Sequence, residues 1–193
     1  MSGLGSAAGC GATAKATLEA GQGVTAIGAS IMIDAAPYLR KLLPGIVIDA
    51  QIGRQMFQAQ AVTAHLKLKG ELGRRVIIKL DTNGSFTNEQ LISSLHSLGK
   101  VQQIVLVNTR VPRPWEGVVN STLAEVAKTF PHTTLFNWYT ASVGKNAYFY
   151  PDGVHLNPEG AQFYAGLIAK AVNPQPKRNG PCSSPRPLRP HSG

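Results

Sequence analysis

Short runs of apolar residues alternate along the middle of the chain with longer segments in which apolar residues recur at helical spacing. The apolar runs have the length of strands buried on both faces, and the longer segments are typical of amphipathic helices. We predict strands over residues 24–28, 46–51, 74–80, 102–109 and 133–139, and helices over residues 31–43, 55–69, 88–98, 118–129 and 158–172.

This alternation is typical of a parallel sheet whose two faces are both covered by helices. The sequence therefore predicts an α/β fold: a three-layer α/β/α sandwich around a five-stranded, mostly parallel sheet. Local signals support the helix boundaries, since Pro44-Gly45 ends the first helix and either Thr87 or Asn88 caps the third. Pro158 stands in the first turn of the last helix.

The length of 193 residues allows one well-filled core, whereas two domains would leave each with little core. We assign residues 23–173 to a single domain and residues 1–22 to a flexible flank. Residues 174–193, rich in proline and serine, are expected to be a disordered or non-native tail. The sequence contains no apolar run of membrane-spanning length and no secretory signal, so we expect a soluble chain that is compatible with a piece of a longer protein.

The formal net charge of +9 raises nucleic acid or an anionic surface as partners. Four of the surplus positive charges lie in the tail, at Lys177, Arg178, Arg186 and Arg189, so the expected domain is only mildly basic. No nucleic-acid-binding signature is present, and no stripe of basic residues with interleaved aromatics. The sequence therefore does not favour nucleic-acid binding.

Nothing in the sequence indicates a metal or another cofactor. Cys10 and Cys182 lie in the two flanks and form no disulfide framework. His65, His96 and His132 are scattered over expected helices and loops without the spacing of metal ligands.

The loops that follow the strands are the places to look for chemistry, because ligands bind beyond the carboxyl ends of strands in such sheets. Ser30 follows the first strand, Gly53 the second and Asn83 the third. The connection before the last helix contains Asp152 and His155, separated by two residues. A serine becomes a nucleophile when a histidine accepts its proton and a carboxylate orients that histidine.

Each of these residues also has an ordinary structural interpretation. Ser30 stands where a helix N-cap belongs, and Asp152 lies in a Pro-Asp-Gly turn. Asn83 precedes a glycine, as in many turns, and Gly53 would satisfy a special backbone angle. The two roles of Ser30 are compatible, because the N-terminus of a helix presents amide groups that can hold an oxyanion.

The order of these blocks along the chain is more informative than any one of them. A small residue and Ser30 come first, then Gly53, then Asn83 in Thr-Asn-Gly, and finally Asp152-x-x-His155 before the last helix. This order resembles the SGNH, or GDSL-type, hydrolases, and the resemblance covers about residues 24–172. The α/β-hydrolase fold is a poorer match, because Ser30 lacks its G-x-S-x-G elbow.

Four segments narrow the resemblance: "VTAIGAS", "VNTRVPRPWE", "NWY" and "YFYPDGVHLNPEGAQFYA". They are similar to the extracellular C-terminal domain of Gram-positive peptidoglycan O-acetyltransferases. The resemblance implies a cell-wall enzyme that acetylates the C6 hydroxyl of N-acetylmuramic acid and so confers resistance to lysozyme. It also implies that a membrane acyltransferase domain of the full-length protein delivers the acetyl donor. The isolated domain is expected to be monomeric and to need no cofactor.

The resemblance gives each site residue a role. Ser30 would be the nucleophile that carries the acetyl group, His155 the base, and Asp152 the acid that orients it. The amide of Ser30, Gly53 and Asn83 would form the oxyanion hole.

Two positions depart from the pattern of the family. Ala29 stands where many members have aspartate, and Asp81 where glycine is common. Neither change removes a proton-transfer group, but both put the rigidity of the site in question. They leave open a non-catalytic glycan-binding module that has lost its chemistry.

A second alternative is an esterase that removes acyl groups from glycans or small esters, since water and a sugar hydroxyl can use the same residues. Aromatic and basic side chains follow the fourth and fifth strands. In a transferase or an esterase they would either form a platform that binds sugar rings or pack the loops against the core. These side chains are Arg110, Arg113, Trp115, Trp138 and Tyr139.

Overall fold

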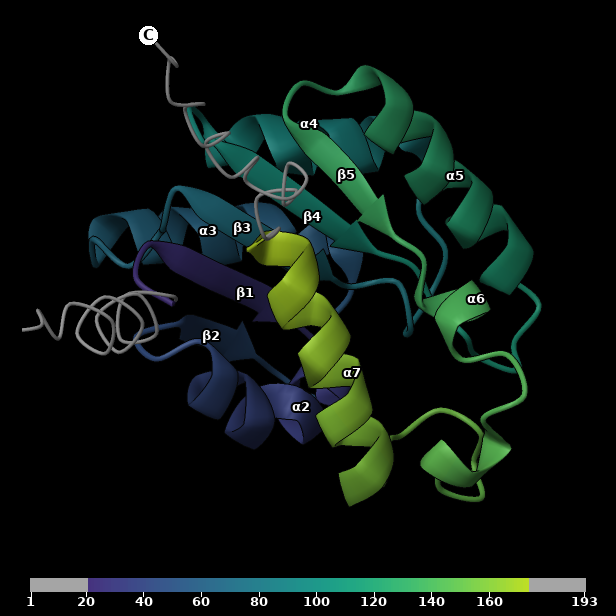
Figure 1. Ribbon diagram of the computed structural model, residues 1–193. Helices are drawn as coiled ribbons and strands as arrows, with labels where there is room; N and C mark the ends of the chain where they lie inside the picture. The colour runs from purple at the N-terminus through teal and green to yellow at the C-terminus, as the bar shows by residue number, and fades with distance from the viewer. Residues whose placement is uncertain (1–20, 174–193) are drawn as a thin grey trace, which may run out of the picture.

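Five parallel strands form one sheet in the computed structural model, which describes residues 21–173 (Figure 1). The strands are β1 Val24–Gly28, β2 Val47–Ala50, β3 Arg75–Lys79, β4 Gln103–Val107 and β5 Thr133–Phe136. The helices are α2 Ser30–Leu42, α3 Ala59–Leu68, α4 Asn88–Leu98, α5 Glu116–Thr129, α6 Trp138–Ala141 and α7 Pro158–Val172. The strand order is β2-β1-β3-β4-β5, and every neighbouring pair is parallel. The predicted α/β fold is confirmed.

Helices cover both faces of this sheet, as Figure 1 shows, with α2 and α7 on one face and α3, α4 and α5 on the other. Strand β4 shows why a central strand of this sheet has consecutive apolar residues, here the four after Gln103. Val105 and Val107 pack in the cluster with α2 and α7, whereas Ile104 and Leu106 pack in the cluster on the opposite face. Successive side chains of a strand point to opposite faces, so the middle of a central strand between two helical layers is apolar on both faces.

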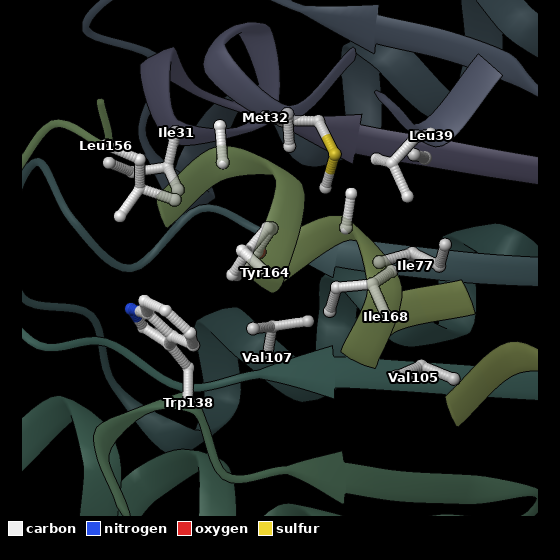
Figure 2. Close-up of a cluster of buried hydrophobic side chains, with 14 of the residues drawn as sticks. Ile31, Met32, Leu39, Ile77, Val105, Val107, Trp138, Leu156, Tyr164 and Ile168 are labelled. Carbon is white, nitrogen blue, oxygen red and sulfur yellow. The ribbon is translucent and has the colours of Figure 1, made fainter. Parts of the chain in front are cut away.

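Aromatic side chains belong to the apolar cluster under α7, near the carboxyl ends of the strands (Figure 2). Trp138 of α6 meets Tyr164 of α7 edge to face, with ring centroids 4.9 Å apart. The predicted fifth strand, residues 133–139, is too long. The observed strand β5 ends at Phe136, because the Asn137 side chain accepts a hydrogen bond from the amide of Thr140 and so caps the short helix α6.

Helix starts differ from the predictions in three places, and one of them is α5, which begins at Glu116 and not at residue 118. Ala29, not Ser30, is the N-cap of α2, and Ser30 is the first helical residue with no capping bond from its side chain. The predicted helix over residues 55–69 consists of a 3-10 turn, Met56–Gln58, followed by α3. Thr87 is the N-cap of α4, which decides between the two predicted caps.

Gly21 and Gln22, assigned to the flank, belong to the turn that enters β1, where the amide of Gly21 donates to the carbonyl of Pro44 at 3.1 Å. The remaining flank with Cys10, and the tail with Cys182, lie outside the described residues. Within residues 21–173, no helix is both long enough and apolar enough to cross a bilayer.

Lys79 and Asp81 form a buried ion pair at the end of β3, on the side of the sheet that faces α7. Each is 1% exposed or less, and the Lys79 ammonium contacts the carboxylate and donates to Thr82 Oγ1 at 2.9 Å. Burial favours the neutral form of each group, so it lowers the pKa of Lys79 and raises that of Asp81. The contact between the two charges offsets part of both effects.

The Asp81→Leu variant is expected to lose about 3–5 kcal/mol of unfolding free energy, because Lys79 would remain buried without its carboxylate. Replacing both residues, Lys79→Met with Asp81→Leu, is expected to recover most of this loss, since no buried charge remains. Urea unfolding of the three proteins measures both effects. A double variant as unstable as the single one would contradict the explanation.

The hydroxyl of Tyr164 is buried and has no hydrogen-bond partner among residues 21–173. Tyr164→Phe is therefore expected to keep or raise the free energy of unfolding, because no hydrogen bond is lost. Tyr164→Ala is expected to cost about 3–5 kcal/mol, as for other buried aromatic residues, by opening a cavity beside Trp138. Urea unfolding followed by tryptophan fluorescence tests the pair, and a loss above about 1 kcal/mol for phenylalanine would reveal a partner of the hydroxyl.

Candidate active site

Ser30, His155 and Asp152 form a hydrogen-bonded chain beyond the carboxyl end of β1. Ser30 Oγ lies 3.0 Å from His155 Nε2, and His155 Nδ1 lies 2.6 Å from Asp152 Oδ2. The serine and the histidine are 125 positions apart in the sequence. A nucleophile, its base and an orienting acid need these contacts and this order.

The turn between β1 and α2 sets the position of Ser30. A Cβ added at Gly28 would lie only 2.3 Å from the Cβ of Met32, so the close approach of the strand end to the helix requires glycine. Ser30 is 7% exposed and stands at the first position of α2. Its amide has no acceptor within the helix and lies at the positive end of the helix dipole.

Asp152 orders the turn that carries the histidine. Its Oδ1 accepts hydrogen bonds from the amides of Val154 and His155 at 2.9 and 3.0 Å, while Oδ2 contacts the ring. The hydrogen bond with His155 and the amide of Val154 lower the pKa of Asp152 to about 2. The carboxylate is therefore ionised at neutral pH, where it fixes the ring so that Nε2 faces the serine.

Asn83 contacts Arg54, the residue after Gly53, although the two come from different loops. Asn83 Nδ2 donates to the carbonyl of Arg54 at 3.2 Å, and Asn83 lines the same cavity as His155. A primary amide has two hydrogens, so one remains for a ligand. Gly53 is exposed with φ of +74°, and a Cβ there would meet nothing within 4 Å, so the backbone angle is what requires glycine.

Arg54, which the sequence analysis did not single out, braces this loop. It is 7% exposed and donates to the side chain and the carbonyl of Asp49, both at 2.7 Å, and to the carbonyl of Gly28 at 3.3 Å. It therefore ties the loop after β2 to the end of β1. The acidic Asp49 on an otherwise apolar strand was the only sequence signal for this contact.

Asp81 stands two residues before Asn83 and has a structural partner that explains its presence. The Lys79 ammonium bonds both Asp81 and the adjacent Thr82, so the start of the loop that carries Asn83 is held from inside the core. Ala29 lies fully buried in the cluster on the other face of the sheet. The two departures from the family pattern thus lie on opposite sides of the sheet.

A cavity of about 240 Å³ opens beside the histidine. Its lining includes Arg113 and Trp115 from the loop after β4, together with Thr82, Asn83, Val111, Asp152, Val154 and His155. The Nε1 atom of Trp115 is buried without a hydrogen-bond partner among the described residues. Arg113 is exposed, and the hydrogen bond of its side chain within the described residues is a long one, 3.4 Å, to the neighbouring Pro112 carbonyl.

The structure does not support a sugar-binding role for two of the residues proposed for it. Trp138 is 2% exposed and belongs to the core, so neither face of its ring is open to a ligand. Arg110 donates to the carbonyl of Ser142 at 2.7 Å and to the side chain of Asn146, and its guanidinium lies over Phe149. It braces the long loop before α7. Tyr139 lines a separate groove beside α5.

No family model matches the chain. Among curated proteins, the peptidoglycan O-acetyltransferase OatA of Listeria monocytogenes is 43% identical over 148 residues, which are 77% of this chain and 24% of that protein. The O-acetyltransferase OatA of Staphylococcus aureus is 38% identical over 147 residues, 76% of this chain and 24% of that protein. The chain thus spans about a quarter of the length of the curated relatives it matches.

A solved structure agrees with these relatives. The C-terminal catalytic domain of the Streptococcus pneumoniae peptidoglycan O-acetyltransferase A, which carries a methylsulfonyl adduct, matches with a TM-score of 0.70 and 24% identity. The match covers 78% of this chain and 92% of that domain, and at this identity it shows the fold. The resemblance inferred from the sequence motifs is confirmed. The chain is a homologue of one part of the peptidoglycan O-acetyltransferases, and it has the fold of a C-terminal catalytic domain of that family.

Proposed function

We propose that the chain is the catalytic domain of a peptidoglycan O-acetyltransferase, which acetylates the C6 hydroxyl of N-acetylmuramic acid through an acetyl-serine. The observation that carries the proposal is the continuous hydrogen-bonded chain from Ser30 through His155 to Asp152. It occurs in a chain that is 43% identical to a protein of that name. The full-length protein would act at the outer face of the membrane, on glycan strands, with a membrane domain supplying the acetyl group.

The first half of the reaction forms an ester on Ser30. His155 Nε2 takes the hydroxyl proton as Oγ attacks the acetyl carbonyl, and the bond to the leaving group breaks as His155 passes that proton to it. The amides of Ser30 and Gly53 and the side chain of Asn83 would hold the negative oxygen of the intermediate. Asp152 keeps its negative charge throughout and stabilises the imidazolium.

The second half of the reaction returns Ser30 to its hydroxyl form. A muramyl hydroxyl gives its proton to His155 and attacks the acetyl carbonyl, and the Ser30 ester bond breaks as the proton returns to Oγ. Water in place of the sugar would release acetate by the same steps. The chain would then act as an esterase, so the identity of the acceptor distinguishes the two functions.

Arg113 and Trp115 are the residues that we propose for acceptor binding. Both line the cavity beside His155, which is where an incoming hydroxyl must approach. Trp115 offers a buried indole N–H that has no acceptor among residues 21–173, and a sugar oxygen would satisfy it. The exposed guanidinium of Arg113 adds a donor that few protein contacts occupy.

The Ser30→Ala variant is expected to abolish activity on an activated acetyl ester, because Ser30 is the hydroxyl that contacts His155 Nε2 in the described part of the chain. Brief exposure of the native chain to the ester should add about 42 Da at Ser30, since a covalent acyl-enzyme is required. Peptide mass spectrometry locates the label. As a graded comparison, Asn83→Ala should retain a trace of activity, with kcat lowered about 10²- to 10³-fold.

Full activity of Ser30→Ala would rule out the triad. A native chain that neither gains mass nor turns over the ester would support the non-catalytic glycan-binding module. With muroglycan fragments as acceptors, acetylated glycan supports the transferase, whereas release of acetate alone supports the esterase.

Trp115→Phe is expected to raise KM for a glycan acceptor several-fold, because the indole N–H is lost while an aromatic ring is kept. The rate at which a small acetyl ester acetylates Ser30 should stay the same, since that step needs no glycan. Steady-state transfer kinetics and acetylation rates test the two halves separately. Tyr139→Phe, which removes a donor outside the cavity, is the matched control. Equal KM values in the native and Trp115→Phe proteins would contradict the role.

A further inference from the structure

Helix α2 offers two polar side chains, one turn apart, to two consecutive residues of the turn before α7. Ser30 Oγ lies 3.0 Å from His155 Nε2, and Asp34 Oδ2 accepts a hydrogen bond from the amide of Leu156 at 3.1 Å. Residues four apart lie on the same face of a helix, so the two contacts run in parallel. The second contact involves no atom of the triad.

The turn over residues 150–156 is bonded mainly to itself. Asp152 accepts from two amides within it, and the amide of Tyr150 donates to the carbonyl of His155 at 2.9 Å. Within the described part of the chain, its hydrogen bonds to α2 are those of His155 to Ser30 and of Leu156 to Asp34. The turn therefore behaves as one piece whose placement on α2 depends on few directional contacts.

Apolar burial alone does not determine that placement. Leu156 is 3% exposed and packs in the same buried cluster as Ile31 of α2 (Figure 2), and Val154 is 8% exposed. Apolar contact is non-directional, whereas a hydrogen bond has a preferred distance and angle. Burial thus fixes how deep the turn lies, and the bond to Asp34 fixes where the backbone beside His155 stands along the helix.

We propose that Asp34 is a positioning residue, which keeps His155 within hydrogen-bond distance of Ser30 by binding the amide of Leu156. The proposal rests on the proposed function, because Ser30 and His155 must act as nucleophile and base. A displacement of about 1 Å at such a site can lower the rate about 100-fold. The tie at Asp34 would therefore matter to the rate although Asp34 does not touch the substrate.

Asp34 has a second way to act, and the experiment must separate the two. Partial burial raises the pKa of Asp34, while the amide of Leu156 and the nearby His155 oppose that rise. Its charge is thus within electrostatic range of the base. Asparagine keeps a carbonyl oxygen that can accept the bond from Leu156 but removes the charge, whereas alanine removes both.

The test compares Asp34→Ala and Asp34→Asn on an activated acetyl ester, with the melting temperature measured for each. We expect Asp34→Ala to lower kcat about 10- to 100-fold with little change in KM, and Asp34→Asn to stay within about threefold of the native chain. Alanine favours helix more than aspartate does, so α2 itself should not suffer. The control is Glu125→Ala, which should leave kcat unchanged. Its carboxylate accepts a hydrogen bond from Asn88 at 3.3 Å, between α4 and α5, on the face of the sheet opposite to α2.

Each other result overturns the proposal in a recognisable way. Native kcat in Asp34→Ala would mean that the apolar contacts of Val154 and Leu156 suffice. Equal losses in the two variants would mean that the charge acts and not the hydrogen bond. A loss that follows a fall in melting temperature would mean a structural role alone. A native chain without ester turnover or label at Ser30 would overturn the proposed function as well, whereas an active native chain with an equally active Asp34→Ala counts against Asp34 only.

Discussion

α2 and α7 pack side by side on one face of the sheet (Figure 1), and this contact brings Ser30 and His155 together. Ser30 is the first residue of α2, and His155 stands three residues before α7. Met32 and Ile168 belong to the cluster that the two helices share with the central strands. Because protein interiors are close-packed, this apolar interface holds the two helices in a fixed arrangement, and we propose that polar bonds such as that of Asp34 complete the alignment.

Sequence reasoning found the residues whose meaning depends on position along a strand. Ser30 and Asn83 follow predicted strands, and parallel strands bring such residues to one edge of the sheet. It failed where the meaning depends on direction. An aromatic residue after a strand can face solvent or core, and Trp138 faces the core because Asn137 turns the chain into α6. Asp34 reads as an ordinary polar position of an amphipathic helix, and only the structure shows which amide it meets.

The loop that carries Asn83 shows how a departure from a family pattern can be compensated from within the core. Asp81 has no access to water, and its charge is matched by Lys79, two residues earlier at the end of β3. Side chains two residues apart in extended backbone point to the same side of a sheet, so Lys79 and Asp81 lie on one face. The pattern Lys-x-Asp at a strand end therefore indicates a local ion pair. Where glycine would leave the backbone flexible, Asp81 is held by its contact with the Lys79 ammonium. The same ammonium also donates a hydrogen bond to Thr82.

The 125 positions between Ser30 and His155 have a consequence for the synthesis of the chain. A ribosome makes Ser30 before His155, and the turn before α7 meets α2 only once α7 has docked. Until then the serine lacks a base, and a hydroxyl without a base is a poor nucleophile. Under the proposed function, the order of the chain thus makes the reactivity of Ser30 depend on the folding of the whole domain, and a misfolded copy would carry an inert serine.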